Sequence, residues 1–180
     1  MKKFIALFLA LGLSLALAAC GNSDVSTGSE GNSSEKKDES KEDSKEKPKD
    51  DGSKTVDASK NSTEAVGMKV SLGEMKVAAD KISVGINLEN TTGDALNFYP
   101  DQGQAVVGDM QLEANLFMTS GEIGGEVQGG VKQDGVIEFL APEGKEIDVA
   151  SIKEVKLLFG DVTTADFMKT KAVEFTVPVK

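Results

Sequence analysis

The 180-residue sequence contains no histidine, no arginine and no tryptophan. Without an imidazole there is no histidine general base, no Ser-His or Cys-His nucleophile pair, and no histidine-containing zinc or iron site. Without a guanidinium group there is no bidentate donor for phosphate or carboxylate. The formal net charge of -10 also disfavours nucleic acid as a partner, since nucleic-acid binding depends on clustered positive charge. The composition therefore predicts a protein that is not an enzyme and that has no cofactor.

Residues 1–19 have the layout of a cleaved secretory signal peptide. Lys2 and Lys3 precede an uncharged apolar run from Phe4 to Ala19, and small residues gather at the end of this run. A membrane-spanning helix is the alternative interpretation. The run has 16 residues, which is shorter than the roughly 20 needed to cross the hydrocarbon core of a bilayer. The pattern therefore favours a signal peptide.

The end of this segment, Leu17-Ala18-Ala19-Cys20, resembles the lipobox of bacterial lipoproteins. The resemblance implies that the Cys20 thiol receives a diacylglyceryl group and that Cys20 becomes the first residue of the mature chain. Cys20 is the only cysteine, so no intrachain disulfide can form. Two acyl chains anchor a protein stably, whereas one chain binds a membrane only marginally. We expect attachment to the extracytoplasmic face of the cell membrane.

Residues 20–63 form a polar segment that follows the signal. From Gly21 to Thr63 the chain contains ten serines, eight lysines, and eleven aspartates plus glutamates, without an aromatic residue. Such a composition cannot bury enough apolar surface to offset the entropy lost on folding. The sequence therefore predicts a disordered linker with a root-mean-square span of about 35 Å.

Residues 64–180 have the composition and the patterning of one β-domain. Apolar residues at 82, 84, 86 and 88 alternate with small or polar residues, and positions 173–179 repeat the pattern. This period of two is typical of strands with one buried face. Turn-forming residues separate further predicted strands, at 68–77 with a phase break at Gly73, 96–99, 110–117, 136–140 and 155–159.

About seven short strands predict an all-β fold, an immunoglobulin-like antiparallel β-sandwich. A small β-barrel is the alternative. Capping-box spacing also predicts two short helical turns, at Ser151 to Glu154 and Thr163 to Met168.

Three stretches carry a family resemblance: Val84 to Gly93, Gly125 to Phe139, and Glu154 to Phe159. Together they resemble a family of immunoglobulin-like domains in lipoproteins of Gram-positive bacteria, related in fold to the mycobacterial immunoprotective secreted antigen. The similarity covers most of residues 68–178. It implies a β-sandwich attached outside the cytoplasm, and it transfers no catalytic residue.

Two groups of residues are candidates for a binding site. Asp94, Asp101 and Asp109 lie in or beside predicted loops, and their carboxylates could meet around Ca²⁺, which prefers oxygen ligands. Phe98 and Tyr99 precede a turn and could form a patch for a protein partner. Against these interpretations, loop carboxylates are usually solvated, and aromatic residues at strand ends usually pack over the core.

These observations favour a lipid-anchored extracytoplasmic protein with a binding or cell-envelope role. Its expected partners are the membrane, through Cys20, and an unidentified envelope protein. One alternative is a module that binds Ca²⁺ or a small ligand. Another is a hydrolase that uses paired carboxylates or a Ser-Lys pair, and such an enzyme would need a cleft with shifted pKa values.

Overall fold

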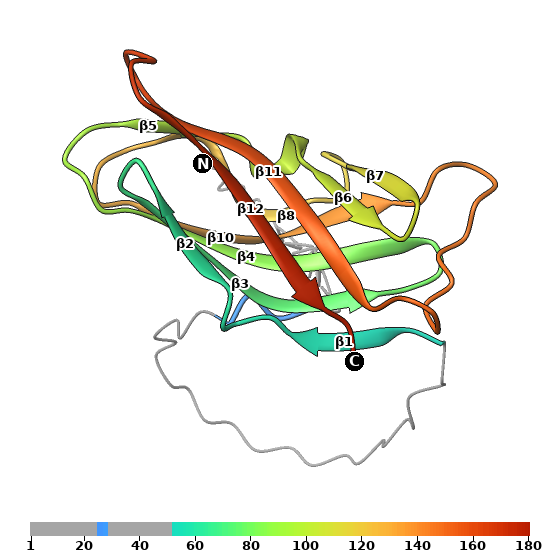
Figure 1. Ribbon diagram of the computed structural model, residues 1–180. Coiled ribbons are helices and arrows are strands. Elements are labelled where there is room, and N and C mark those ends of the chain that lie inside the picture. The colour runs from blue at the N-terminus through green and yellow to red at the C-terminus, as the bar shows by residue number, and fades with distance from the viewer. Residues whose placement is uncertain (1–24, 29–51) are drawn as a thin grey trace, which may run out of the picture.

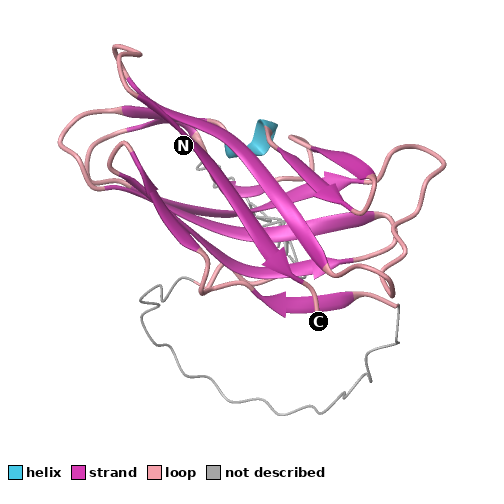
Figure 2. Ribbon diagram, viewed as in Figure 1, coloured by secondary structure: helices cyan, strands magenta, loops and turns pink. Residues whose placement is uncertain are grey.

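The computed structural model describes residues 25–28 and 52–180. The predicted signal peptide, the lipobox from Leu17 to Cys20 and most of the predicted linker lie outside these residues. The described part contains twelve strands and one 3-10 turn, η1 (Pro100–Gln102) (Figure 2). The strands are β1 (Lys54–Asp57), β2 (Ser62–Ala65), β3 (Met68–Val77), β4 (Lys81–Asn90), β5 (Leu96–Phe98), β6 (Gln104–Val107), β7 (Met110–Ala114), β8 (Ser120–Glu122), β9 (Gly125–Val127), β10 (Lys132–Leu140), β11 (Glu154–Thr164) and β12 (Thr170–Pro178).

The strands form an antiparallel sandwich of two layers (Figure 1). One layer has the order β1-β3-β4-β10, with β2 beside β3 and β8 beside β10. In the other layer β11 pairs with β12, β6 and β5, and β9 pairs with β5. Strand β7 pairs with both β10 and β6, so hydrogen bonds join the two layers at this side.

The alternating pattern places one face of each long strand in a shared core. In β4, Ile82, Val84 and Ile86 are completely buried. Across the sandwich, the ring of Phe159 lies 6.1 Å from that of Phe139 and 6.2 Å from that of Phe175, measured between ring centroids. The three rings belong to β10, β11 and β12, so they connect the layers through the core.

The predicted all-β sandwich is confirmed, with more strands than the seven expected. The folded part also begins earlier than residue 64, because β1 and β2 arise within the segment predicted as linker. Both strands pair along β3, and Ala58 and Ala65 are completely buried. Backbone pairing with β3 orders these residues despite their polar composition.

The two predicted helical turns do not form. Glu154 begins β11, and Thr163 and Thr164 end it. Each segment instead overlaps an end of β11, which pairs with β12 from Glu154↔Pro178 to Thr163↔Thr170. Residues three apart with capping-box identities can equally well lie at a strand end and in a hairpin turn, and here the long-range pairing determines the structure.

Candidate functional site

The three candidate calcium ligands do not form a shared site. Asp101 lies in η1, Asp109 follows β6, and Asp94 follows β4. Among the described residues, no group of three or more His, Cys, Asp or Glu side chains is arranged to hold a metal ion. The three carboxylates lie on loops that follow three different strands, β4, β5 and β6.

Phe98 and Tyr99 do not form a joint surface patch. Phe98 is completely buried, whereas Tyr99 is 48% exposed. In β5, Leu96 and Phe98 share the core face because they are two residues apart. Tyr99 follows the strand, so only this ring of the predicted pair is available to a partner.

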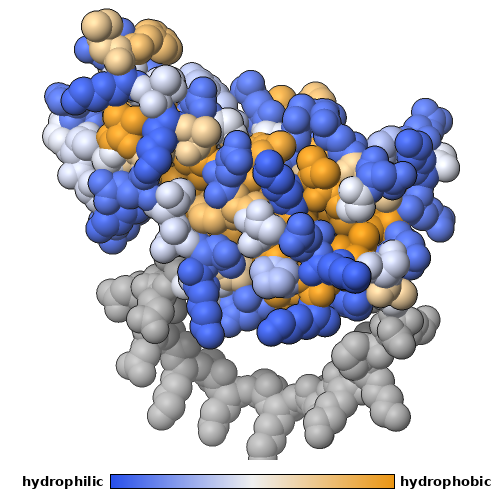
Figure 3. Space-filling model, in the orientation of Figure 1, coloured by the Kyte–Doolittle hydropathy of each residue, from blue (hydrophilic) through white to orange (hydrophobic). Residues whose placement is uncertain are grey.

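Other large apolar side chains are more exposed, and they lie in two loops. The loop after β7 carries Leu116, Phe117 and Met118, and Phe117 is 99% exposed. The turn between β11 and β12 carries Phe167 and Met168, which are 73% and 81% exposed. Figure 3 shows an apolar cap at the end of the β11–β12 hairpin. Neither cluster was predicted from the sequence, although apolar residues beside turn-forming residues could have indicated both.

Hydrogen bonds order the β11–β12 turn. The Thr164 hydroxyl donates to Asp166 Oδ1 over 2.5 Å, and the Met168 N–H donates to the same oxygen over 3.0 Å. These two bonds, the Thr164 bond first, hold the pKa of the Asp166 carboxyl below its usual value. Phe167 has a φ of 58°, a left-handed conformation that is rare for a bulky residue. The turn thus holds two apolar side chains outward in a defined, strained conformation.

A second feature lies on the outer face of the β3-β4-β10 layer. Residues 25–28, blue in Figure 1, pack there as a segment that we call the strap. The Ser26 N–H donates to Glu74 Oε2 and the Glu74 N–H donates to the Ser26 carbonyl, both over 2.9 Å. Asn87 Nδ2 donates to the Thr27 carbonyl over 2.5 Å. Val25 is only 6% exposed, so the strap is bound through both its backbone and a side chain.

Two glycines form the floor under the strap. A Cβ at Gly73 would lie 2.3 Å from the Thr27 carbonyl oxygen, and one at Gly85 would lie 2.3 Å from the Ser26 carbonyl oxygen. The pairing of β3 with β4 shifts between Leu72 and Met75, which is the irregularity predicted at Gly73. Such a bulge frees backbone groups from the ladder, and here the Glu74 N–H bonds to the strap.

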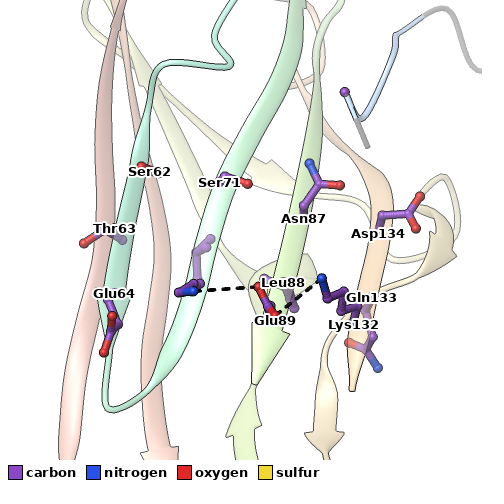
Figure 4. Close-up of a pocket in the computed structure, with 13 residues that line it drawn as sticks. Ser62, Thr63, Glu64, Ser71, Asn87, Leu88, Glu89, Lys132, Gln133 and Asp134 are labelled. Carbon is purple, nitrogen blue, oxygen red and sulfur yellow. Dashed lines mark ion pairs between the residues drawn. The ribbon is translucent and has the colours of Figure 1, made fainter. Parts of the chain in front are cut away.

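The strap leads to an open polar groove of about 590 Å³ (Figure 4). Its walls come from β2, β3, β4 and β10, and Gly28 of the strap also lines it. Glu89 stands in the groove with Lys132 Nζ at 3.4 Å and Lys69 Nζ at 4.0 Å. Asn87 and Asp134 lie where the groove meets the strap, and the Thr27 hydroxyl donates to Asp134 Oδ2 over 3.5 Å. The groove and the strap thus share one surface of mixed charge.

Comparison with known proteins shows similarity of fold. No protein-family model and no curated protein matches the sequence. A functionally unknown protein from Listeria monocytogenes EGD-e is 11% identical, with a TM-score of 0.52, and the match covers 71% of this chain and 88% of that chain. A candidate lipoprotein of Bacillus subtilis, ycdA, is 13% identical, with a TM-score of 0.46 and coverage of 69% and 39%. The B. subtilis yjhA protein is 10% identical, with a TM-score of 0.43 and coverage of 69% and 100%.

The first of these structures shows that the sandwich is a fold shared with a protein of a Gram-positive bacterium. Within residues 25–28 and 52–180, no helix has the length and apolar character required to span a bilayer. Leu17, Ala18, Ala19 and Cys20 lie outside the described residues, so lipidation of Cys20 remains a prediction from the sequence.

Proposed function

We propose that this protein is a lipid-anchored extracytoplasmic binding protein without catalytic activity. The diacylglyceryl group on Cys20 holds the mature chain at the membrane, and the sandwich contacts an envelope protein through the Phe167–Met168 turn. The observation that carries this proposal is the ordered turn that exposes both of these side chains. Large apolar side chains that are held rigidly outward are typical of contact sites for proteins.

Neither of the two carboxyl groups with a shifted pKa has the shift that a catalytic acid requires. Hydrogen bonds from Ser59 lower the pKa of Asp57, and hydrogen bonds from Thr164 and Met168 lower that of Asp166. A glycosidase general acid requires the opposite shift, a pKa raised toward neutrality. The sequence also contains no imidazole that could act as a base.

Photo-crosslinking in intact cells tests the contact site. A photoreactive residue replaces Phe167 in one variant and Glu174, an exposed residue of β12, in a control variant. We expect a defined crosslinked protein from position 167, absent from position 174, and lost when Met168→Ser is added. Equal crosslinking from both positions, or capture that Met168→Ser does not reduce, would contradict the proposed contact site.

Cell fractionation tests the anchor separately. Cys20→Ala should move the protein out of the processed, membrane-bound fraction, because a thioether to diacylglycerol requires the thiol. Replacement of Ser23, three residues further on, by Ala should leave membrane binding unchanged. Equal membrane attachment of the Cys20→Ala protein after signal cleavage would show that the anchor is not on Cys20.

A further inference from the structure

Contacts within the sandwich do not account for the glycines under the strap, Gly73 and Gly85. For both Gly73 and Gly85, the three atoms that would lie nearest to an added Cβ all belong to Ser26 or Thr27. Neither glycine has the positive φ that requires glycine at other positions. A side chain at either position would therefore clash first with the strap, since no other part of the domain lies closer. The missing side chains make a trench across β3 and β4 that fits an extended backbone.

The sides of the trench recognise that backbone. The Glu74 backbone N–H donates to the Ser26 carbonyl, as in a strand pairing, while the Glu74 side-chain carboxylate accepts from the Ser26 N–H. The Asn87 amide binds the next carbonyl along, that of Thr27. Val25, the first residue of the strap, is buried, and Gly28, the last, lines the open groove. Backbone bonds combined with one buried apolar side chain are the means by which sheets bind extended peptides.

We propose that this trench is a peptide-binding site, that its occupant is the chain's own segment Val25–Gly28, and that the bound strap holds the sandwich close to the membrane. The last part rests on the proposed anchor at Cys20. Val25 follows Cys20 closely in the sequence, and the five residues from one to the other span at most about 18 Å when extended. Without a bound strap the tether would run from Cys20 to the start of β1, and a flexible chain of that length has a root-mean-square span of roughly 30 Å.

The sandwich can therefore lie at two distances from the membrane, a short one with the strap bound and a longer one with the strap released. While the strap is bound, the domain is connected to the lipid through only the few residues between Cys20 and Val25. When the strap leaves the trench, the whole segment from Cys20 to β1 becomes available as tether. The contacts that decide between the positions are those of Glu74, Asn87 and the two glycines with residues 25–27.

Disulfide trapping tests the occupant of the trench. Thr27→Cys and Asp134→Cys are introduced together into the full chain carrying Cys20→Ala, so that these are the only two thiols. The two side chains are 3.5 Å apart at Thr27 Oγ1 and Asp134 Oδ2, and we expect an intramolecular disulfide under mild oxidation. The control pair joins Thr27→Cys with Glu174→Cys on the other layer. Disulfides that form between molecules, or equally fast trapping of the control pair, would overturn docking within one chain.

Glycine substitutions test the trench itself. Gly85→Ala or Gly73→Ala should slow trapping of the 27–134 pair by at least about tenfold, because overpacking of a close contact disfavours the bound strap. Gly93→Ala is the matched control, since a Cβ there meets no atom within 4 Å, and trapping should stay at the parent rate. Circular dichroism verifies that each variant folds. Folded Gly85→Ala and Gly73→Ala proteins that trap at the parent rate would contradict the role of the trench.

The position of the sandwich is measured in the lipidated protein. Energy transfer from a donor on the domain to a membrane dye should fall when Gly73→Ala and Gly85→Ala are combined, since the released domain moves away from the bilayer. Unchanged transfer, despite loss of trapping, would overturn the positioning role. Membrane retention of the Cys20→Ala protein after signal cleavage would overturn the anchor alone, because the trapping experiment uses protein without the lipid. The two failures are therefore distinguishable.

Discussion

At the scale of single residues, Asn90 shows how one polar side chain organises a loop. It is completely buried at the end of β4. Its amide nitrogen donates to the carbonyls of Asp94 and Val127, each over 2.8 Å, and its oxygen accepts from the N–H and the hydroxyl of Thr92. From the sequence, the stretch after β4 could be identified as a turn, but the contact with Val127 bridges to β9.

We expect Asn90→Ala to lower the free energy of unfolding by about 2–3 kcal/mol, because it removes the hydrogen bonds of a completely buried amide, including its bond to the Val127 carbonyl. Urea denaturation measures this change. Asn115→Ala is the control, since that side chain accepts one bond, from Phe117 N–H, in an exposed loop and should cost less. Equal losses of unfolding free energy in the two variants would show that the buried hydrogen bonds of Asn90 do not stabilise the fold more than an exposed one.

Asp166 makes the order of the β11–β12 turn depend on pH. Its pKa is lowered in the folded protein from an ordinary value of 3.8. A carboxyl with a lowered pKa contributes stability that is present above the unfolded pKa and is lost as the pH falls through the folded pKa. We expect the Met168 amide to exchange faster as the pH falls below 3.8, after correction for intrinsic exchange. Asp166→Asn should remove this pH dependence, and the amide of Lys169, which bonds to Thr164 Oγ1, provides an internal comparison.

At the scale of elements, the β11–β12 hairpin is strained at its tip. The φ of 58° at Phe167 suits glycine better than a side chain with a Cβ. Because the Phe167 side chain is 73% exposed, burial in the core does not offset the strain of its backbone. This combination is the reason to place partner binding at the turn.

Phe167→Gly should therefore raise the free energy of unfolding by about 0.5 kcal/mol, net of the greater freedom of glycine in the unfolded chain. It should also abolish partner crosslinking from a photoreactive residue at position 168. Met168→Gly is the comparison for stability, since Met168 has no positive φ and should not be stabilised. Thermal denaturation of the two variants separates strain at Phe167 from a general effect of glycine in the turn.

At the scale of the whole molecule, Phe159 connects the two layers. Its ring contacts Phe139 on β10 and Phe175 on β12. We expect Phe159→Ala to cost about 3–5 kcal/mol of unfolding free energy, through lost burial and the cavity that remains. Phe117→Ala, at a ring that is 99% exposed, should change stability by less than about 0.5 kcal/mol. Chemical denaturation followed by far-ultraviolet circular dichroism measures both variants.

The long strands were predictable because their pattern is local. Predicted strands at 68–77, 96–99, 136–140 and 155–159 all overlap observed strands, and even the break at Gly73 appears as a register shift. The short strands β1, β2, β6, β8 and β9 were not predictable. Each has at most four residues, too few to establish an alternating pattern, and pairing with longer or more distant strands orders them, as β11 does for β6 and β3 does for β1.

The sequence by itself determined the all-β sandwich, because alternation of apolar residues requires two buried sheet faces. It also determined the absence of imidazole chemistry and the prediction of a lipid on Cys20. Only the tertiary structure decided that Phe98 is buried, that Phe167 is exposed, and that residues 25–28 bind across Gly73 and Gly85. These outcomes depend on which surfaces meet in space, and a four-residue segment that binds through its backbone and one apolar side chain leaves no local pattern that could predict its partner.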